Sequence, residues 1–592
     1  MGHRGPDGEG VAEVPEHDLV LEHVRLAVID PANREADQPF SDPSGRWTMV
    51  YNGEVFNFRE LRGELERAGV RFTTESDTEV VLQAFLNWGP DAFSRLRGMF
   101  ALVVADLVTG ELVAARDQVG VKPLYWSFRG GLFLAASELR TITGHPGQAN
   151  ALDHPGVVEY LAFGHNGEER TFLEGVHKLR PGTWLRLAEG RVETHEYWDV
   201  VPADAPDKTH LVEDLSDRIE DSVRAALVSD VPVSMMLSGG FDSSTIAVLA
   251  SRLVDPAGLT AYSVSFGLPS DESDAAARLA RTLGIRHRVI TLGTEDITSG
   301  MGAWLDQMDA PSANPTWIAV SHIARAVHED GGKVLLSGDG GDELFGGYDR
   351  WMTYLRFHDR VWAPTPRIVR RAGGTMISPI LRGLAGDMAR RARDGGELFV
   401  ESRPFHDDDL RLTLGPAGKR AAHAHPPERS IAEIRARFDS RLPGGDYLAW
   451  MSYLSLKAGL VEDFLARLDK MGMAHSVEGR VPLLDAGLAR WALATPQSLK
   501  VPGFRNKALF REAVEPLLPA FITSRPKQGF CPPVAAWATA ALPVTSAPGT
   551  ALVDSGLVMA GAADALRAKG GDNASFALWT LGTLDAWCER HL

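Results

Sequence analysis

The sequence is poor in cysteine, since Cys531 and Cys588 are the only two among 592 residues. So few cysteines exclude a disulfide framework and a cysteine-rich structural zinc site, and they fit a reducing compartment. The chain also lacks any stretch approaching the roughly 20 apolar residues that span a bilayer. Its first residues, MGHRGPDGEG, lack the apolar core of a signal peptide. We therefore expect a cytoplasmic protein with no membrane partner.

Positive charge is scarce relative to negative charge. The 61 lysines and arginines are outnumbered by 78 aspartates and glutamates, which gives a net charge of −17. This balance argues against the broad basic surface of a nucleic-acid-binding protein, so we expect no nucleic-acid partner. The apolar fraction of 44% is ordinary for a globular chain, and the length suggests about two to four domains.

The chain divides into regions with different patterns of apolar and polar residues. Residues 1–200 carry short alternating runs, a hairpin pattern over 101–117 and a turn signal at Asn52-Gly53, all typical of an α+β domain. Residues 201–212 are polar with prolines and predict a linker. In residues 213–592 strand patterns alternate with helical ones, which predicts an α/β domain with a doubly wound parallel sheet. From about residue 440 the pattern is mostly helical.

A glycine-rich turn joins a buried strand to a helix in VPVSMMLSGGFDSSTIAVLA (231–250). Gly239 and Gly240 let the backbone approach a ligand closely, and the N-terminus of the following helix favours phosphate. Asp242 is out of place beside a bare phosphate, but it fits a site where Mg²⁺ lies between the carboxylate and the phosphates. Hydroxyl donors are added by Ser238, Ser243 and Ser244.

This segment resembles the PP-loop of the ATP pyrophosphatases, a HUP-like fold, and in particular that of the asparagine synthetases. The resemblance implies that ATP is cleaved between its α and β phosphates to give an acyl-adenylate and pyrophosphate. The nucleotide contacts that it implies are Leu237, Ser238, Gly239, Gly240, Asp242, Ser243, Ser244, Ser265, Phe266, Ser337 and Gly338.

A second acidic loop follows the strand in KVLLSGDGGDELFGGYDRW (333–351), which resembles the SGEGxDExFGGY pattern of the asparagine synthetases. The resemblance implies that Asp342 joins Asp242 in holding Mg²⁺. Asp339 stands where the family often has glutamate, at the position that handles the acceptor and the attacking ammonia. A carboxylate there can take the proton as ammonia attacks. Because aspartate is shorter by one methylene group, the identity of the acceptor stays open.

Two later segments continue the resemblance. LDKMGMAHSVEGRVPLLD (468–485) is similar to VDRxSMAxSxExRVPxLD, and we expect these residues to be mostly structural, with Glu478 and Arg480 forming an ion pair. SRPKQGFCPPVAAW (524–537) is similar to the RxKxGFxxPxxxW ending. Lys527 matches a lysine that stabilises charge on the phosphates in the transition state, an electrostatic role worth several kcal/mol in a dry site.

The amino-terminal region resembles the class II glutamine amidotransferase domain of the same family, an Ntn-type αββα fold. HRGPDGEG (3–10) carries the match. The resemblance implies that Arg25 holds the glutamine carboxylate, that Asn52 and Gly53 form the oxyanion hole, and that Asp77 binds the substrate amino group.

The nucleophile of that domain is missing from this sequence. Family members begin with a cysteine directly after the initiator methionine, whereas this chain starts at the HRGPDG motif. Either the start was assigned too late, at an internal methionine, or glutaminase activity is lost and the synthetase uses free ammonia. As written, the chain is not expected to hydrolyse glutamine.

The leading function is ATP-dependent amide formation, with asparagine made from aspartate and nitrogen from glutamine or ammonia. The alternative is a relative that activates another carboxylate, for natural-product amidation, lasso-peptide cyclisation or lactam formation. A non-catalytic scaffold is a third hypothesis, which the intact Asp242, Asp342 and Lys527 disfavour. The expected cofactors are ATP and Mg²⁺, the partners are small molecules, and a homodimer is left open.

Overall fold

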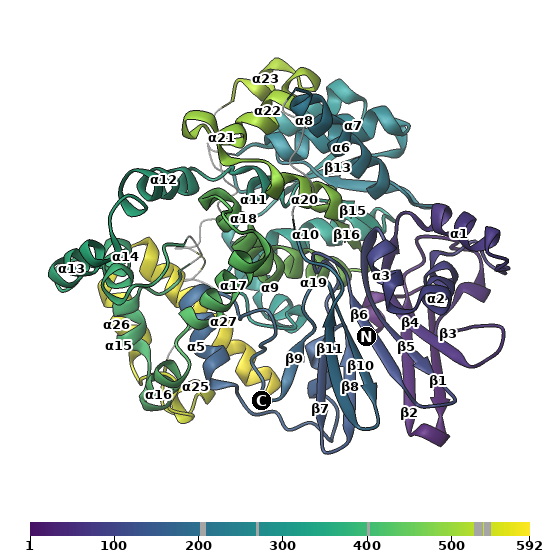
Figure 1. Cartoon of the computed structure of the whole chain (residues 1–592), viewed down its shortest axis with the longest axis horizontal. Helices are drawn as coiled ribbons and strands as arrows, with labels where there is room; N and C mark the ends of the chain where they lie inside the picture. Colours follow the sequence, from purple (N-terminus) through teal and green to yellow (C-terminus); the bar gives the residue numbers. More distant parts are fainter. Residues whose placement is uncertain (202–208, 268–270, 400–402, 526–536, 538–545) are drawn as a thin grey trace.

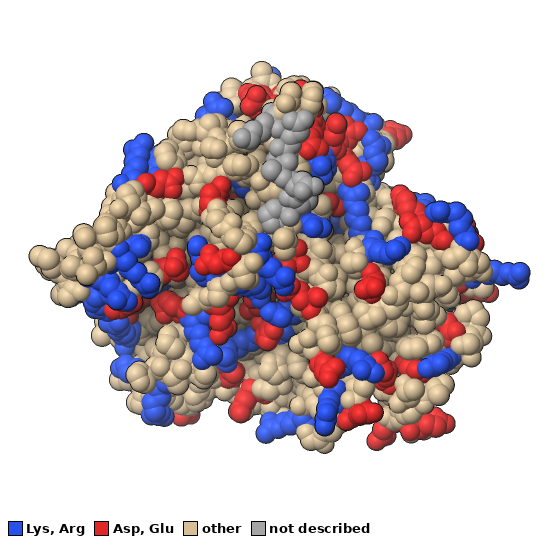
Figure 2. Space-filling model, viewed as in Figure 1, with Lys and Arg blue, Asp and Glu red and all other residues tan. Residues whose placement is uncertain are grey.

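The computed structural model describes the chain except for residues 202–208, 268–270, 400–402, 526–536 and 538–545. Lys527, which is predicted to stabilise charge on the phosphates, lies outside the described residues. Cys531 lies outside them as well. No helix within the described ranges is long and apolar enough to cross a membrane. Basic and acidic side chains are interspersed over the face drawn in Figure 2.

The amino-terminal half is built on two stacked antiparallel sheets (Figure 1). The six-stranded sheet has the order β11-β10-β6-β5-β4-β3, and the three-stranded sheet has the order β8-β7-β9. Their strands are β3 (Phe40–Ser41), β4 (Trp47–Val55), β5 (Gly98–Asp106), β6 (Leu112–Arg116), β7 (Tyr125–Arg129), β8 (Leu132–Ala136), β9 (Val176–Lys178), β10 (Thr183–Ala188) and β11 (Arg191–Glu196). A separate hairpin pairs β1 (Gly8–Val14) with β2 (Leu19–Arg25).

The side chains of β5 alternate between two faces, which explains why helices pack on one side of the six-stranded sheet and the three-stranded sheet packs on the other. Phe100 and Leu102 pack against α1 (Phe58–Arg67) and α2 (Asp77–Trp88), whereas Ala101 and Val103 face the three-stranded sheet. Successive side chains of a strand point to opposite faces, so this central strand is buried on both. The outer face of the smaller sheet is covered by α4 (Leu139–Thr143) and α5 (His154–Phe163). The predicted αββα arrangement and the hairpin over 101–117 are confirmed.

The turn predicted at Asn52-Gly53 is wrong. Both residues lie inside β4, and Gly53 pairs with Phe100 of β5. A Cβ atom on Gly53 would lie 2.1 Å from the carbonyl oxygen of Met99. The glycine therefore permits a close approach between two strands rather than a reversal of the chain.

The second half contains a five-stranded sheet in which every neighbouring pair is parallel, in the order β14-β13-β12-β15-β16. The strands are β12 (Val233–Met236), β13 (Thr260–Ser265), β14 (Arg286–Thr291), β15 (Val334–Leu336) and β16 (Glu478–Arg480). One face packs on α6 (Leu211–Ala226), α7 (Phe241–Leu253) and α8 (Ser273–Leu283), and the other on α10 (Thr316–Glu329). The predicted doubly wound sheet is confirmed, and its strand order reverses between β12 and β15, where such sheets bind ligands.

α6 begins at Leu211, within the residues 201–212 predicted to be a linker, and the division into domains stays a prediction. The rest of the second half is mainly helical, and its run of consecutive helices begins earlier than residue 440, at α11. Its helices are α9 (Thr294–Gln307), α11 (Gly341–Phe345), α12 (Asp349–Phe357), α13 (Arg367–Ile377), α14 (Gly383–Asp394), α15 (Asp407–Thr413), α16 (Pro416–Ala424), α17 (Glu428–Arg441), α18 (Tyr447–Lys457), α19 (Ala466–Met473), α20 (Ala486–Ala494), α21 (Gln497–Lys500), α22 (Ala508–Val514), α23 (Ala520–Thr523), α25 (Ala551–Asp554), α26 (Ala562–Lys569) and α27 (Asp572–His591), with a π-helical stretch over Leu460–Leu465. In Figure 1, α13 and α14 form a hairpin that projects from the body.

Buried ion pairs join the two halves. Arg4 of the HRGPDG motif donates to Asp469, with Nη2 and Oδ2 2.9 Å apart, and Lys122 lies 3.4 Å from the same carboxylate. The ion pair predicted between Glu478 and Arg480 is confirmed at 2.9 Å. Asp469, expected to be structural, therefore joins the amino-terminal half to the half that contains the parallel sheet.

Candidate active site

Two glycine-rich loops meet at the point where the strand order reverses. The first (residues 237–240) follows β12, and the second (residues 337–340) follows β15. An added Cβ on Gly338 would lie 3.2 Å from the Cβ of Asp242, and one on Gly341 would lie 2.5 Å from its Oδ1. The loops are thus in contact, and a larger residue at either glycine would push them apart.

The first loop is shaped by its own hydroxyl groups. Gly239 has a φ of +82°, which favours glycine. The Oγ atoms of Ser238 and Ser243 lie 3.1 Å apart, and Ser238 Oγ accepts a hydrogen bond from the N–H of Gly240 at 3.2 Å. Because α7 begins at Phe241, its first N–H groups lie at this loop, as in anion-binding helix N-termini.

A buried lysine joins the two predicted magnesium ligands. Lys507 Nζ lies 2.6 Å from Asp242 Oδ2 and 2.7 Å from Asp342 Oδ1. Burial alone would lower the pKa of Lys507, but the two carboxylates outweigh it and raise that pKa above its ordinary value. The two aspartates therefore converge on one position, which the ammonium group of Lys507 occupies. That they hold Mg²⁺ stays a prediction.

The predicted base Asp339 is held by an arginine and a serine. Arg467 Nη2 lies 3.0 Å from Asp339 Oδ1, and Ser337 Oγ donates to Asp339 Oδ2 at 2.7 Å. Arg467 also donates through Nη1 to Thr316 Oγ1 at 2.7 Å. The carboxylate is thus fixed in orientation, with a buried positive charge beside it.

Glu343 is a second carboxylate at the same loop. Its Oε1 accepts a hydrogen bond from the Tyr348 hydroxyl at 2.6 Å, and its side chain is buried. Burial and the nearby charge of Asp342 raise the pKa of Glu343 to about 7, although the bond from Tyr348 opposes the shift. This carboxyl group can therefore gain or lose a proton near neutral pH.

The remaining predicted nucleotide residues lie in different places. Ser265 and Phe266 end β13 at the same edge of the sheet, where Ser265 Oγ donates to Asp271 Oδ2 at 2.6 Å. Leu237 and Ser244 are fully buried, and the Ser244 hydroxyl has no hydrogen-bond partner among the described residues. These two side chains face the interior rather than the loop surface.

The predicted glutamine-binding residues gather around β4. Asn52 and Gly53 lie on this strand, and the Asp77 carboxylate accepts hydrogen bonds from the Tyr51 hydroxyl at 2.8 Å and from the Val55 N–H at 3.0 Å. Burial raises the pKa of Asp77 to about 6 against these hydrogen bonds. The three predicted residues are thus neighbours in space.

Arg25 at the end of β2 is bound by the protein itself. It donates to Asp37 Oδ1 at 2.8 Å and to the carbonyl groups of Ile29, Asp30 and Asn33. Its side chain therefore organises the loop that follows, and the contact with a glutamine carboxylate stays a prediction.

Cys588 is the one cysteine that falls within the described ranges. It is buried in α27, in the second half of the chain, and burial raises the pKa of its thiol. A raised thiol pKa disfavours the reactive thiolate, so Cys588 does not replace the missing nucleophile.

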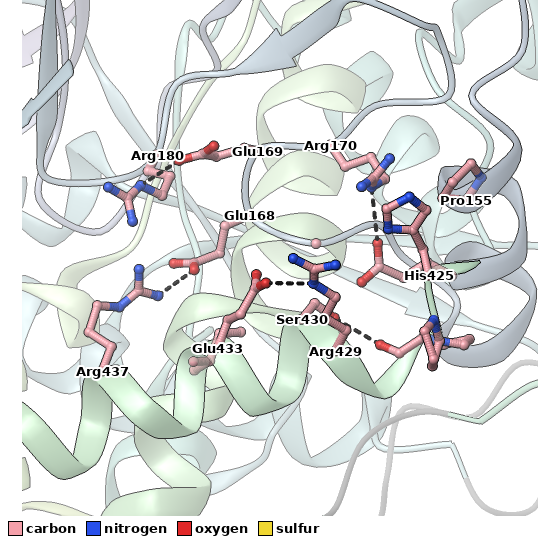
Figure 3. Close-up of a pocket in the computed structure, with 15 residues that line it drawn as sticks. Pro155, Glu168, Glu169, Arg170, Arg180, His425, Arg429, Ser430, Glu433 and Arg437 are labelled. Atoms are coloured by element: carbon pink, nitrogen blue, oxygen red, sulfur yellow. Dashed lines mark hydrogen bonds and ion pairs between the residues drawn. The ribbon is translucent and has the colours of Figure 1, made fainter. Parts of the chain in front are cut away.

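Another pocket, of about 330 Å³, lies between the 155–180 segment and α17 (Figure 3). Figure 3 shows arginine and glutamate side chains facing one another across it. The ion pairs at this pocket are Arg170 with Asp153, Arg180 with Glu169, Arg429 with Glu433 and Arg437 with Glu168. Because these charges neutralise one another, the pocket offers no charge for catalysis, and it contains no residue of the two loops.

Four residues of the site were not predicted from the sequence: Arg467, Glu343, Tyr348 and Lys507. Glu343 and Tyr348 lie inside the quoted segment 333–351, so their residue types were a usable signal. Arg467 immediately precedes the recognised segment 468–485. Lys507 lies in FRNKALFREAV, where one lysine among charged neighbours gives no sign of its buried position.

Comparison with known proteins agrees with this geometry. A family model described as asparagine synthase matches residues 214–589, and one described as a glutamine amidotransferase domain matches residues 1–198. An asparagine synthetase (glutamine-hydrolysing) of Bacillus subtilis is 31% identical over 547 residues, which cover 90% of this chain and 83% of the relative.

Two fungal relatives are named amidases. Amidase chry2 of Gibberella zeae is 29% identical over 585 residues, covering 91% of this chain and 84% of the relative. Amidase chyE of Penicillium rubens is 29% identical over 579 residues with the same shares. The chain therefore belongs to the asparagine synthase family of ligases, with a glutamine amidotransferase domain as its amino-terminal part.

Proposed function

We propose that this chain forms an amide bond through an acyl-adenylate, with ATP, Mg²⁺, a carboxylic acid and ammonia as reactants. The observation that carries the proposal is the convergence of Asp242 and Asp342 on one cation position at the switch point of the sheet. Family membership supports the reaction type.

The donor set fits a magnesium ion that arrives with the nucleotide. Mg²⁺ is usually bound through one or two carboxylates together with substrate phosphates. Asp242 and Asp342 supply that number, and the described residues contain no larger group of His, Cys, Asp or Glu able to hold a resident metal ion. When bound, Mg²⁺ would neutralise charge on the phosphates.

In adenylation, an oxygen of the acid attacks the α-phosphorus of ATP, the bond to the bridging oxygen breaks, and pyrophosphate leaves. Gly239, Gly240 and the N-terminus of α7 would hold the phosphates, with Ser238 and Ser243 as hydroxyl donors. Lys507 bridges the two aspartates in this structure, so it would move aside when Mg²⁺ binds between them. From there it would oppose the growing charge of the leaving group, as the predicted Lys527 would. Positive charge fixed in a water-poor site is effective because it needs no rearrangement during the reaction.

In amidation, the nitrogen lone pair of ammonia attacks the acyl carbon, AMP leaves, and the nitrogen gives up a proton. Asp339 is the proposed acceptor of that proton, and Arg467 with Ser337 positions it. Ammonia would come from glutamine, bound by Arg25, Asn52, Gly53 and Asp77, or from solution.

Aspartate is the first acid to test, because Bacillus subtilis relatives are named asparagine synthetases. A second candidate, amidation of a different acid, is favoured by aspartate in place of glutamate at position 339 and by the relatives named amidases. A cytoplasmic location and a homodimer also stay predictions.

The experiment is incubation with ATP, Mg²⁺, aspartate and ammonium, followed by measurement of AMP, pyrophosphate and asparagine. Equal amounts of the three products support asparagine synthesis. AMP and amide with some other acid alone would move the function to the second candidate. Absence of pyrophosphate with every acid tested would leave only the scaffold hypothesis.

A further inference from the structure

A cavity of about 340 Å³ opens next to α11, the helix that follows the second loop. Glu343 of α11 and Tyr348 form part of its lining, and so do Asn314 and Asp463. The cavity therefore begins four residues after Asp339 in the chain.

A chain of hydrogen bonds connects the cavity to Asp339. Arg467, which holds Asp339, donates to Thr316 Oγ1, and Thr316 donates in turn to Asn314 Oδ1 at 2.7 Å. Asn314 Nδ2 donates to Asp463 at 2.7 Å. The guanidinium of Arg467 also lies 4.8 Å from the ring centre of Phe464, another lining residue. An acid whose carboxyl group reaches Asp339 and Arg467 would thus have its body in this cavity.

The cavity is large for a substrate as small as aspartate. Its volume falls in the range of about 300–1,000 Å³ that is typical of pockets for drug-sized ligands. Its walls include the aromatic rings of Phe163, Trp351, Phe464 and Phe576, contributed by α5, α12, the π-helical stretch and α27. Such walls favour an apolar or aromatic body, because burial of apolar surface is the main source of affinity in such a pocket.

The charges in the lining also disfavour aspartate. Aspartate keeps a second carboxylate after one is activated, and that group needs a cation. The lining contributes two carboxylates, Glu343 and Asp463, whereas the basic groups among the described lining residues are Arg350, which is exposed, and His165, which is buried. Asp463 is fixed by hydrogen bonds from Asn314 and from Trp317 Nε1 at 3.0 Å. Asp463 in this position favours an amine on the substrate and disfavours a second acid group.

We propose that the acid activated here is larger than aspartate and is an aromatic or bulky apolar carboxylic acid that carries an amine. This inference rests on the proposed adenylate-forming function and specifies its substrate class. The predicted order of preference is an aromatic amino acid, then an aromatic acid without an amine, then aspartate.

The test is ATP–pyrophosphate exchange by the full chain with L-phenylalanine, 3-amino-3-phenylpropanoate, 3-phenylpropanoate and L-aspartate as separate probes. We expect kcat/KM for at least one aromatic amino acid to exceed that for aspartate about tenfold or more, the lower limit for discrimination by an apolar pocket. Aspartate as good as or better than every aromatic probe overturns the inference and leaves the proposed function intact. No exchange with any acid overturns the proposed function, and the inference falls with it.

Phe576→Ala provides a second readout. We expect it to reduce kcat/KM for the preferred aromatic acid about tenfold and to reduce that for aspartate less. Phe576→Leu keeps an apolar side chain and should retain part of the activity if the alanine variant does not fold. Leu578→Ala on the same helix, outside the lining, is the matched control. Equal losses with both acids in Phe576→Ala contradict the inference.

Discussion

Lys507 Nζ lies within hydrogen-bond distance of both carboxylate oxygens of Asp242, at 2.7 and 2.6 Å. The contact spans much of the sequence and links the first loop of the parallel sheet to the start of α22. Lys507 itself has a φ of +49°, a conformation uncommon for lysine. Such backbone strain is more frequent at functional sites than elsewhere, which agrees with a role at the phosphates.

Lys507→Met is expected to slow ATP–pyrophosphate exchange about 100-fold or more, the usual loss when one fixed electrostatic group is removed. Lys507→Arg, which keeps the charge, should lose less. Lys419→Met, at an exposed position on α16, is the matched control. A normal exchange rate in Lys507→Met would show that Lys507 serves the fold alone.

Asp339→Asn should separate the two half-reactions. If Asp339 takes the proton from ammonia, amide formation should fall about 10²–10⁴-fold, while ATP–pyrophosphate exchange with the same acid continues. Arg467→Gln should affect both steps, because Arg467 positions Asp339 and lies beside the acid. Equal losses of exchange and amide in Asp339→Asn would contradict the assigned role.

Glu343 should make the fold less stable as pH rises. Its carboxyl group has an ordinary pKa of 4.5, and burial raises that pKa to about 7, so the folded chain binds the proton more tightly than the unfolded chain. The stabilising contribution of the proton is complete below pH 4.5 and is lost as pH rises towards 7. The total is up to about 3 kcal/mol at 1.36 kcal/mol per pKa unit.

The measurement is the thermal midpoint of the native chain and of Glu343→Gln between pH 4.5 and 8. The variant should gain stability relative to the native chain across this interval, since glutamine does not ionise. Taking the difference between the two proteins removes the contribution of other groups such as Asp77. A constant difference across the interval would mean that Glu343 does not titrate there.

Asp469→Asn should destabilise the junction of the two halves more than Arg4→Ala does. The asparagine variant removes the carboxylate that two buried cations share and leaves Arg4 with Glu138 at 3.3 Å and Lys122 with Glu478 at 3.7 Å. Breaking a buried pair in this way costs about 3 kcal/mol. Arg4→Ala leaves Asp469 its contact with Lys122. Urea unfolding would measure the free energy of unfolding of both variants. The control is Arg429→Ala, which removes an exposed ion pair worth about 0–1 kcal/mol.

Gly53→Ala should disrupt the pairing of β4 with β5, since a Cβ there would overlap the Met99 carbonyl. Overpacking of this kind costs about 1–3 kcal/mol or more, and the neighbouring Asn52 would shift with the strand. Gly63→Ala in α1, where a Cβ meets no atom within 4 Å, should be neutral or stabilising. Thermal midpoints compare the two, and similar values would show that the strands adjust freely.

Much of the fold was predictable because its signals are local. Strand-turn-helix patterns around residues 231–250 and 333–351 predicted both loops, and parallel pairing placed Asp242 and Asp342 at one edge of the sheet. Partners distant in sequence were not predictable. Lys507, between the two aspartates, and Arg467, beside Asp339, are brought to the site by the packing of later helices. The turn prediction at Asn52-Gly53 was wrong because it relied on the local preference of this dipeptide. Glycine is required there by a contact with Met99 on the neighbouring strand, which the local sequence does not reveal.

The packing of α27 has a consequence for the order of synthesis. This helix supplies Phe576 to the cavity wall, and its Trp587 ring lies 5.5 Å from that of Phe172 in the amino-terminal half. Residues 572–591 leave the ribosome long after the strands of the antiparallel sheets and of the parallel sheet have been made. The nascent chain can therefore form the nucleotide loops early, but the compartment for the acid is completed only when the final helix folds against segments made several hundred residues before it.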